Sequence, residues 1–448
     1  MPYVRLTIAL VALNVGAAKC ASAQSFHPIE IPPLPFSLSS PVASVLDVSP
    51  DGSRVAGAII QHGVDIDCAG LKCTTPFTWS ATGGMDIEGF QESVQLYETQ
   101  YGPYLEHAEE IVGVTRDFAL ANGSQAEPIL FNSNGHRLLR EVNGERSAMI
   151  ATALSADASV IVGLTLETDG WQAFRWNEST GVTPIVTGHR SAYATGVSND
   201  GRVVVGTSSE SIYFAGNRAF RWSESDGVTY LESLHPNGGN LPTAISADGL
   251  VVVGTAWSEE GYRAYRWTAE DGTVPVEIPA EFSASAAADV SADGQVLVGQ
   301  LVVDEGFGFS GFMGWADPTI NYQDAAPAIT AKQSHAMIWD AVNGTRLLRD
   351  ALANDYGLAD QLEGWSLVSA SAMSANGHVI AGVGVNPAGE FQGWVVIIPE
   401  PNAIVLALCG LTLLALFSPA VWKDRCRYTR KVPATSASAQ SGPPDQSD

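Results

Sequence analysis

The chain has 448 residues, of which 46% are hydrophobic and 16% charged, and its 23 basic against 48 acidic residues give a formal net charge of −25. This composition is too apolar for a disordered chain and supplies enough side chains for a large buried core. A surface this acidic repels nucleic acids and anionic polymers, so nucleic acid is excluded as a partner.

Residues 1–23 predict a signal peptide. Arg5 precedes the apolar stretch 6–15, and Ala21-Ser22-Ala23 matches the small-residue pattern of a cleavage site. We therefore expect cleavage between Ala23 and Gln24 and an exported mature chain.

Two cysteines, Cys68 and Cys73, lie in the exported part, separated by four residues. In an oxidising compartment such a pair predicts one small disulfide loop. A metal site is the alternative, but it lacks further Cys ligands or nearby His ligands. We expect no bound metal.

A ten-residue pattern recurs along the exported part. It reads LSADASVIVG at 154–163, VSNDGRVVVG at 197–206, ISADGLVVVG at 245–254 and VSADGQVLVG at 290–299. Three weaker copies also occur. The glycines that end the seven copies are Gly57, Gly113, Gly163, Gly206, Gly254, Gly299 and Gly382. An aromatic or apolar triplet follows each glycine: FTW at 77–79, ILF at 129–131, FRW at 174–176, FRW at 220–222, YRW at 265–267, MIW at 337–339 and QGW at 392–394. The sequence therefore contains seven units.

Each landmark of the unit has a local cause. Ser-x-Asp-Gly predicts a tight turn, because Asp and Ser bond to their own backbone and Gly adopts positive φ. The β-branched run that follows predicts a strand buried on both faces. The aromatic triplet, a second turn and a short strand complete four strands. In the third unit Ala158 replaces the glycine, so we expect a slightly different turn there.

Seven four-stranded units predict an all-β fold, a β-propeller formed by residues 24–398. An open β-solenoid is the rival, but it needs a shorter and more uniform period. We expect the ring to close by strand sharing, with residues 31–36 beside residues 394–398. One unit carries an insertion at about 300–334.

The C-terminal part predicts a membrane-spanning helix. Residues 403–422 carry no charge and are long enough to cross a bilayer core of roughly 30 Å. Five basic residues follow within 423–431, which places residues 24–398 on the outer side. A buried hydrophobic helix is the alternative. The polar tail at 432–448 predicts disorder.

The repeat resembles a known family. Ser-x-Asp-Gly-x-Val-Val-x-Gly followed by Ala-Phe-x-Trp is similar to the HAF-type extracellular repeat of secreted bacterial proteins, and residues 335–339 read HAMIW. Ser49-Pro50-Asp51-Gly52 also resembles the hairpin of Tol-type propeller blades. These resemblances imply a fold and leave the function open.

The C-terminal segment has a resemblance of its own. Pro399-Glu400-Pro401, one hydrophobic span and a basic cluster look like a PEP-CTERM sorting signal over residues 399–431. The resemblance implies an exosortase-like membrane peptidase as partner, an association with exopolysaccharide, and display at the cell envelope. The tail after residue 431 departs from the family pattern, in which signals stop soon after the basic cluster.

No catalytic motif, phosphate-binding loop or dinucleotide fingerprint occurs, and the eight histidines are scattered. We predict no catalytic residue and no cofactor. The recurring turn aspartates favour turn chemistry over a calcium-binding ring. The arginines within the triplets favour a structural ladder over a ligand-binding ring, and the triplet tryptophans favour the core over a sugar site. The predicted binding surface consists of Trp171, Trp257, Trp365, Phe312 and Trp315, the last two in the insertion.

These observations predict a non-enzymatic interaction scaffold at the cell surface or in the extracellular matrix, binding polysaccharide or envelope proteins. An extracellular hydrolase or lyase acting on polysaccharide through carboxylates in the central channel is the alternative. A pair of Asp or Glu side chains at one mouth of the ring would favour the enzyme.

Overall fold

The computed structural model describes residues 24–31, 42–61, 73–86, 108–114, 118–123, 128–132, 135–139, 149–167, 170–210, 216–303 and 334–398. The chain divides into two compact units, Met1–Ile398 and Pro399–Asp448, and every described residue belongs to the first. In these ranges no helix has the length and apolar character needed to cross a membrane. The predicted span at 403–422 and the Pro399-Glu400-Pro401 motif lie outside the described residues.

The described part of the chain forms seven four-stranded antiparallel sheets, here called blades. Blades one to three are β2 (Val42–Val48), β3 (Val55–Gln61), β4 (Cys73–Ser80), β5 (Gly84–Asp86); β6 (Ala108–Val114), β7 (Phe118–Gly123), β8 (Pro128–Asn132), β9 (Gly135–Leu138); and β10 (Met149–Leu154), β11 (Val160–Glu167), β12 (Gly170–Asn177), β13 (Gly181–Pro184). Blades four to six are β14 (Ser191–Val197), β15 (Val203–Ser209), β16 (Arg218–Ser223), β17 (Gly227–Tyr230); β18 (Asn240–Ile245), β19 (Val252–Ser258), β20 (Gly261–Thr268), β21 (Gly272–Pro275); and β22 (Ala284–Val290), β23 (Val296–Val302), β24 (Ser334–Asp340), β25 (Gly344–Leu347). Blade seven is β26 (Ser366–Met373), β27 (Val379–Val385), β28 (Phe391–Ile397) and the N-terminal β1 (Ser25–Pro28).

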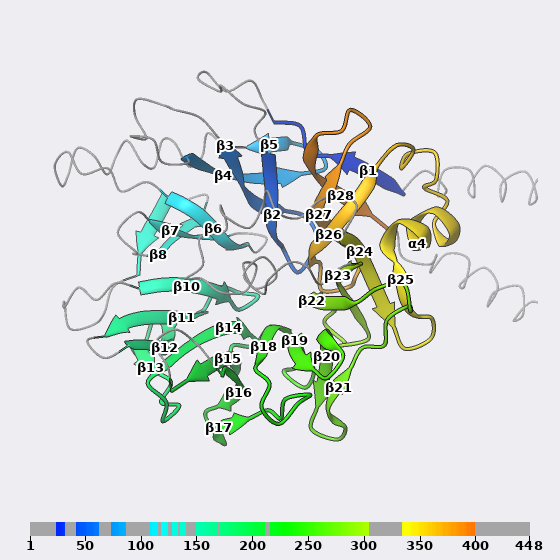
Figure 1. The fold of residues 1–448 in the computed structure, drawn as a ribbon. Helices are drawn as coiled ribbons and strands as arrows, with labels where there is room; N and C mark the ends of the chain where they lie inside the picture. The colour runs from blue at the N-terminus through cyan, green and yellow to red at the C-terminus, as the bar shows by residue number, and fades with distance from the viewer. Residues whose placement is uncertain are drawn as a thin grey trace, which may run out of the picture. The chain divides into compact units, whose positions relative to one another are not determined.

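The blades stand in a closed ring around the first strand of each sheet. Strand β2 contacts β6, β6 contacts β10, and the series continues through β14, β18, β22 and β26 back to β2. Figure 1 shows the sheets following one another around the ring in chain order. This propeller-like arrangement confirms the all-β prediction.

The ring has two distinct ends, because antiparallel strands alternate in direction. The turns that join first to second and third to fourth strands meet at one end, here called the turn end. The links between second and third strands, and those from blade to blade, meet at the other, here called the loop end.

The Ser-x-Asp-Gly turns form as predicted. In blade five the Ser246 hydroxyl donates to Asp248 Oδ1 at 2.6 Å, and the same oxygen accepts the Leu250 N–H at 3.0 Å. The Gly249 N–H donates to the Ser246 carbonyl at 2.9 Å, with φ +72° at the glycine. The same bonds recur in blades one, three, four, six and seven, with Asn376 in place of Asp in the last.

The expectation of a different turn at Ala158 is wrong. Ala158 adopts φ +55°, and its N–H donates to the Ser155 carbonyl at 2.8 Å, as the glycines do in the other blades. The side-chain bonds of the motif therefore hold even an alanine in the left-handed region.

The glycine in the second strand lies opposite a bulge in the first strand. Every described first strand has at least one register shift, for instance between Pro242 and Ala244 in β18, and β6 and β26 have two. The bulge turns a carbonyl toward the facing glycine, so that a Cβ on Gly254 would overlap the Leu241 carbonyl oxygen. The six glycines in this position are Gly57, Gly163, Gly206, Gly254, Gly299 and Gly382.

Two alignments made from the sequence are wrong. Gly113 lies in β6, the first strand of blade two, whereas the second strand is β7. Trp394 pairs with Gly382, the place taken by Phe174 opposite Gly163 in blade three. In blade three the repeat glycine faces the first residue of the triplet FRW, whereas in blade seven it faces the last residue of QGW. Trp394 is therefore equivalent to Phe174 and not to the triplet tryptophan Trp176.

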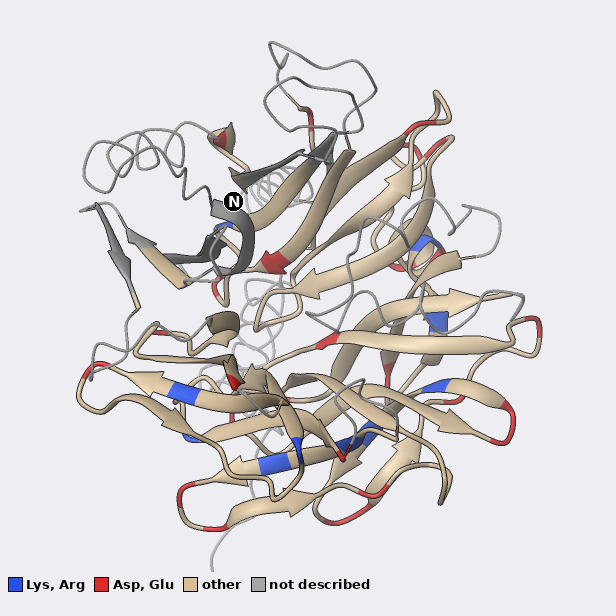
Figure 2. Cartoon of the chain, turned by 60° about the vertical axis from the view of Figure 1, so that its left-hand side comes forward, with Lys and Arg blue, Asp and Glu red and all other residues tan. Residues whose placement is uncertain are grey.

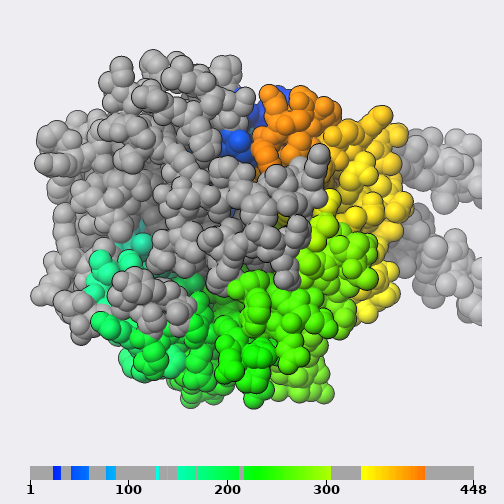
Figure 3. Space-filling model, in the orientation of Figure 1, coloured from blue at the N-terminus to red at the C-terminus, as the bar shows by residue number. Residues whose placement is uncertain are grey.

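The ring closes by strand sharing, but with a different segment from the one predicted. Residues 25–28 form β1 and pair with β28 in the order β1-β28-β27-β26. The space-filling view shows the blue N-terminal residues beside the orange C-terminal ones (Figure 3). Of the predicted segment 31–36, only residue 31 is described, and it lies outside any strand.

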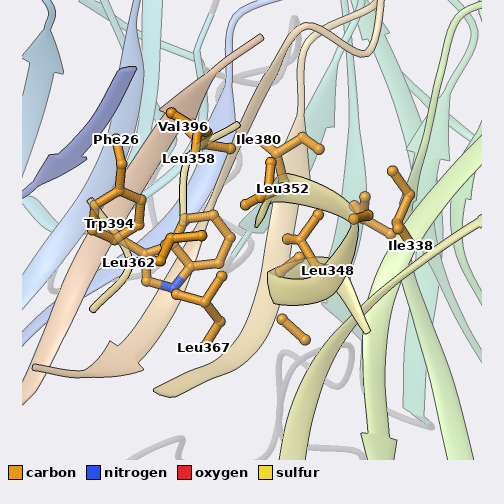
Figure 4. Close-up of a cluster of buried hydrophobic side chains, with 14 of the residues drawn as sticks. Phe26, Ile338, Leu348, Leu352, Leu358, Leu362, Leu367, Ile380, Trp394 and Val396 are labelled. Atoms are coloured by element: carbon orange, nitrogen blue, oxygen red, sulfur yellow. The ribbon is translucent and has the colours of Figure 1, made fainter. Parts of the chain in front are cut away.

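A hydrophobic core supports the closure. Phe26 of β1 packs edge-on against Trp365, with ring centroids 5.0 Å apart, and is stacked on Trp394 at 6.2 Å. Helix α4 (Leu348–Asp355) and the segment after it contribute leucines to the same cluster, among them Leu352 and Leu362 (Figure 4). The chain's first strand is thus fixed by residues more than 300 positions later.

Candidate functional site

The predicted binding residues are divided between the loop end and the core. Trp171 and Trp257 lie beside the hairpins of blades three and five, at the loop end. The insertion also leaves and re-enters the ring there, because Val302 pairs with Ser334. Phe312 and Trp315 lie outside the described residues.

The surface assignment of Trp365 is corrected by the structure. Its side chain is 8% exposed and belongs to the core under β1. The sequence analysis placed it on the binding surface because it lies outside the repeat triplets, but in the structure its ring packs against Phe26.

The two loop-end hairpins share one design. Trp257 pairs across the strands with Tyr262, and Leu166 pairs in the same way with Trp171. Trp257 is 38% exposed and Leu166 is 47% exposed, so each hairpin shows an apolar side chain to solvent. The Trp257 and Tyr262 rings meet edge-on with centroids 4.9 Å apart. Trp257 is therefore the exposed ring of the pair, next to the exposed acidic hairpin residues Glu259 and Glu260.

The turn aspartates are structural. Asp157, Asp200 and Asp293 each accept a serine hydroxyl and a backbone N–H, and these bonds hold the pKa of each carboxyl below its usual value. For Asp157 the bonds from Ser159 contribute most, and for the other two the serine hydroxyl contributes most. The three residues are exposed at the turn end, and Asp200 Oδ2 also lies 3.7 Å from Arg202 Nε. Figure 2 shows acidic residues at many hairpin tips.

The recurring arginines join neighbouring blades. Arg175, Arg221 and Arg266 donate from Nε to the turn-glycine carbonyls of the following blades, Gly201, Gly249 and Gly294, at 3.1, 3.2 and 3.3 Å. Each arginine therefore binds the main chain of the next turn, and the structural ladder predicted from the sequence is present.

Backbone hydrogen bonds also link the turns into an arc around the channel mouth. The N–H of the residue after each turn serine donates to the equivalent carbonyl of the next blade, from Ala156 through Asn199, Ala247, Ala292 and Ala375 to Pro50. Pro50 lacks an N–H, so the arc ends there. The turn end of the channel is therefore narrowed by main chain.

A cavity of about 220 Å³ lies inside this mouth. Six first strands line it, and the described lining includes two carboxylates, Asp47 and Asp289, and no Lys, Arg or His. Both aspartates stand two residues before a turn serine, where the other described blades have Ala153, Gly196, Ala244 and Ala372. The sequence analysis did not predict these two channel carboxylates. The pattern that could have revealed them is Asp-Val-Ser, which precedes the turn in blades one and six and in no other described blade.

Asp289 has the most perturbed carboxyl of the site. Burial in the channel raises its pKa to about 6, although Val290 and Met373 N–H groups donate to its two oxygens at 2.7 Å and oppose the shift. Met373 belongs to blade seven, so the carboxylate also spans the seam between two blades. A carboxyl with a raised pKa inside a cavity is a candidate proton donor or acceptor.

Among the described histidines, His189 has the contacts closest to a catalytic arrangement. Its Nδ1 lies 2.9 Å from the Ser208 hydroxyl, and its Nε2 lies 3.6 Å from Glu210. Ser208 is fully buried, so its hydroxyl has no access to a substrate. The histidine also stacks on Tyr230 with ring centroids 5.0 Å apart, which indicates a packing role.

The remaining predicted sites are only partly described. Cys73 begins β4 opposite Gln61, whereas Cys68 lies outside the described residues. Gln24 directly precedes β1, and Ala23 is not described. Within the ranges given above, no three His, Cys, Asp or Glu side chains come together to hold a metal ion.

Comparison with known proteins gives a likeness of fold alone. No family model matches, and no curated protein matches. Among solved structures, the chain is similar to a TolB candidate from Agrobacterium tumefaciens (12% identity, 63% of this chain and 87% of that one, TM-score 0.39) and to TolB from Acinetobacter baumannii (14%, 77% and 80%, 0.38). It is also similar to an oligogalacturonate lyase from Vibrio parahaemolyticus (10%, 84% and 98%, 0.47). Likenesses this distant leave the activity open.

Proposed function

We propose that this chain is an exported, non-enzymatic scaffold that binds a neutral polysaccharide at the loop end of its propeller. The observation that carries the proposal is the exposed Trp257, packed edge-on against the half-buried Tyr262 at the insertion-bearing end of the ring. At the turn end, the repeated Ser, Asp and Arg side chains form hydrogen bonds within the turns and between neighbouring blades. The loop end is the end at which the blades differ more from one another.

The chemistry of the loop end fits a sugar polymer. An aromatic ring presents a flat apolar face to the C–H groups of a sugar ring, and aromatic side chains offer a large contact area at little conformational cost. The hairpin carboxylates Glu259 and Glu260 are acceptors for sugar hydroxyls. The acidic surface repels uronate or sulfate groups, so a neutral polymer is the better ligand.

The predicted processing signals supply the location. We propose that residues 1–23 direct export and that Pro399-Glu400-Pro401, followed by the uncharged span, sorts the chain through an exosortase-like peptidase to the cell envelope. A scaffold released or anchored there meets extracellular polysaccharide directly.

The test is binding and turnover on one panel of polymers. Purified chain is incubated with immobilised neutral glucans, mannans and galactans and with anionic pectate and alginate, and both bound protein and released sugars are measured. The proposal expects retention on at least one neutral polymer with no released oligosaccharide. Retention confined to anionic polymers, or the release of sugar from any polymer, contradicts it.

A second candidate function rests on the channel carboxylates. Asp47 and Asp289 line one mouth of the ring, which is the arrangement that a propeller hydrolase or lyase would use. If they are catalytic, released sugar in the panel disappears in the Asp47→Ala and Asp289→Ala chains while binding persists. If activity survives both changes, the channel is not the active site.

A further inference from the structure

The turn at residues 235–238, in the link between blades four and five, packs against Trp257 at the loop end. The Gly238 N–H closes this turn by donating to the His235 carbonyl at 2.9 Å. A Cβ on Gly238 would lie 2.9 Å from the Trp257 carbonyl oxygen and 3.1 Å from the Trp257 Cβ. The Trp257 N–H donates to the next carbonyl, that of Gly239, at 3.0 Å. A change in this turn therefore reaches Trp257.

The tip of the turn is an Asn-Gly pair, Asn237 and Gly238. Because glycine has no side chain, its main-chain nitrogen can approach the preceding carboxamide closely. The Gly238 nitrogen loses its proton and attacks Cγ of Asn237, a new N–Cγ bond closes a cyclic imide, and the side-chain nitrogen leaves as ammonia. Water then opens the ring at either carbonyl and gives aspartate or isoaspartate. The reaction needs water alone, and nothing is oxidised or reduced.

Exposure alone does not single out this pair. Three Asn-Gly pairs have described side chains, and all three asparagines are exposed: Asn237, Asn343 and Asn376. The glycine amides do not separate them either, because the Gly377 N–H donates to the Ser374 carbonyl at 2.8 Å, much as Gly238 does in its own turn. The difference lies in the side-chain amides, which must turn toward the glycine nitrogen to react.

Two of the three side-chain amides are held by hydrogen bonds. Asn376 Oδ1 accepts the Ser374 hydroxyl at 2.8 Å and the His378 N–H at 3.1 Å. Asn343 Nδ2 donates to both carboxylate oxygens of Asp340 at 3.0 Å.

Asn237 differs from both of them. Its main-chain N–H donates to His235 Nδ1 at 3.2 Å, and its side chain has no hydrogen bond within the described part of the chain. The Asn237 amide can therefore reorient freely, whereas the other two must first break their bonds.

We propose that Asn237 is a site of spontaneous deamidation in the folded protein, and that this modification weakens polysaccharide binding at the loop end. The second part rests on the proposed function. Either product replaces a neutral amide with a carboxylate in the turn that packs against Trp257. Isoaspartate also inserts a methylene group into the main chain directly before Gly238. Since Gly238 has no room for even a Cβ against Trp257, the turn or the tryptophan must move.

The experiment follows the three asparagines in one sample. Purified chain is kept at mildly alkaline pH, and peptide mass spectrometry measures the replacement of the side-chain NH₂ by OH at each Asn-Gly pair over time. At roughly fivefold for each hydrogen bond that must break, Asn237 should convert at least about fivefold faster than the other two. In denaturant the three rates should converge, because the dipeptide is the same. Equal rates in the folded chain, or slower conversion at Asn237, overturn the inference.

Asn237→Gln is the matched control, because the longer side chain would have to close a larger ring that forms much more slowly. Gly238→Ala is unsuitable, since its Cβ would meet Trp257. Fresh and aged samples of both chains are compared on the neutral polymers. The aged original chain should bind more weakly than its fresh sample, and the aged Asn237→Gln chain should bind as its own fresh sample does.

The outcomes separate the modification from the proposed function. Conversion at Asn237 with equal binding by fresh and aged chains overturns the effect on binding and leaves the modification and the proposed function standing. Absence of binding by the fresh chain contradicts the proposed function and the effect on binding together, while the mass spectra still decide whether Asn237 is modified.

Discussion

The carbonyl oxygen of Leu241 lies where a side chain on Gly254 would stand. The contact arises because β18 bulges between Pro242 and Ala244 and turns the carbonyl into the sheet. It recurs in six blades, so the glycine that ends each hydrophobic run is needed for space rather than for a special backbone angle.

Gly254→Ala should destabilise the protein by about 1–3 kcal/mol, the usual cost of overpacking a filled core. Chemical denaturation followed by tryptophan fluorescence measures the change. Gly239→Ala in the link to the same blade is the control, since a Cβ there meets its nearest neighbours at an ordinary 3.5 Å. Equal losses in the two variants would contradict the role of the bulge.

Tyr265→Phe should stabilise the fold. The Tyr265 hydroxyl is buried without a hydrogen-bond partner, whereas Phe174 and Phe220 take this place in other blades. An unsatisfied buried hydroxyl costs about 1–3 kcal/mol, which the variant regains. The matched change Tyr230→Phe should have the opposite sign, because that hydroxyl donates to the Thr187 carbonyl at 2.5 Å. A loss of stability in both variants would count against this account.

Asp289→Ala should flatten the pH dependence of stability between about pH 4 and pH 6. The folded-state pKa of about 6 lies above the usual 3.8, so the protonated carboxyl stabilises the fold at low pH and this stabilisation is lost as the pH rises. Roughly two pKa units correspond to about 3 kcal/mol. Alanine fits the position, since Ala153 and Ala244 occupy it elsewhere.

Thermal unfolding at a series of pH values measures the difference between the two chains. Asp157→Asn serves as the control of opposite sign, because the pKa of Asp157 is lowered and its contribution is lost as the pH falls. Asn376 shows that the turn accepts asparagine. An unchanged pH profile in the Asp289→Ala chain would contradict the burial of this carboxyl.

Phe26→Ala should release the closing strand. The ring of Phe26 is 7% exposed and packs between Trp365 and Trp394, so its removal should cost about 3–5 kcal/mol. Hydrogen exchange should rise most at the β28 amides that pair with β1. His27→Ala, on the other face of the strand, is the control. Hydrogen exchange that rises equally in all blades would show that β1 does not unfold separately from the rest of the ring.

The repeat made most of the fold predictable, because each turn depends on contacts within ten residues. Ser246, Asp248 and Gly249 form their turn through hydrogen bonds within the motif itself. The β-branched run that follows is suited to a buried strand of the sheet, so local preference and fold agree. The ladder of arginines was also predictable, since equivalent residues of a repeat face equivalent neighbours.

What failed depended on contacts between distant parts of the chain. The closing strand was misplaced because Phe26 finds its partners in Trp365 and Trp394, which no local pattern reveals. Trp394 was aligned two residues away from its position for the same reason. Asp47 and Asp289 line one cavity only when the ring closes, so the channel site needed the structure.

The most direct test of the account compares two exposed apolar residues at opposite ends of blade five. Trp257→Ala changes the loop end and Leu250→Ala changes the turn end, at 38% and 59% exposure. Binding to the best neutral polysaccharide of the panel is measured for both by affinity electrophoresis, after equal melting temperatures show that both are folded. The account predicts at least tenfold weaker binding for Trp257→Ala and unchanged binding for Leu250→Ala. Unchanged binding for Trp257→Ala, or equal loss in both, would contradict the loop end as the binding surface.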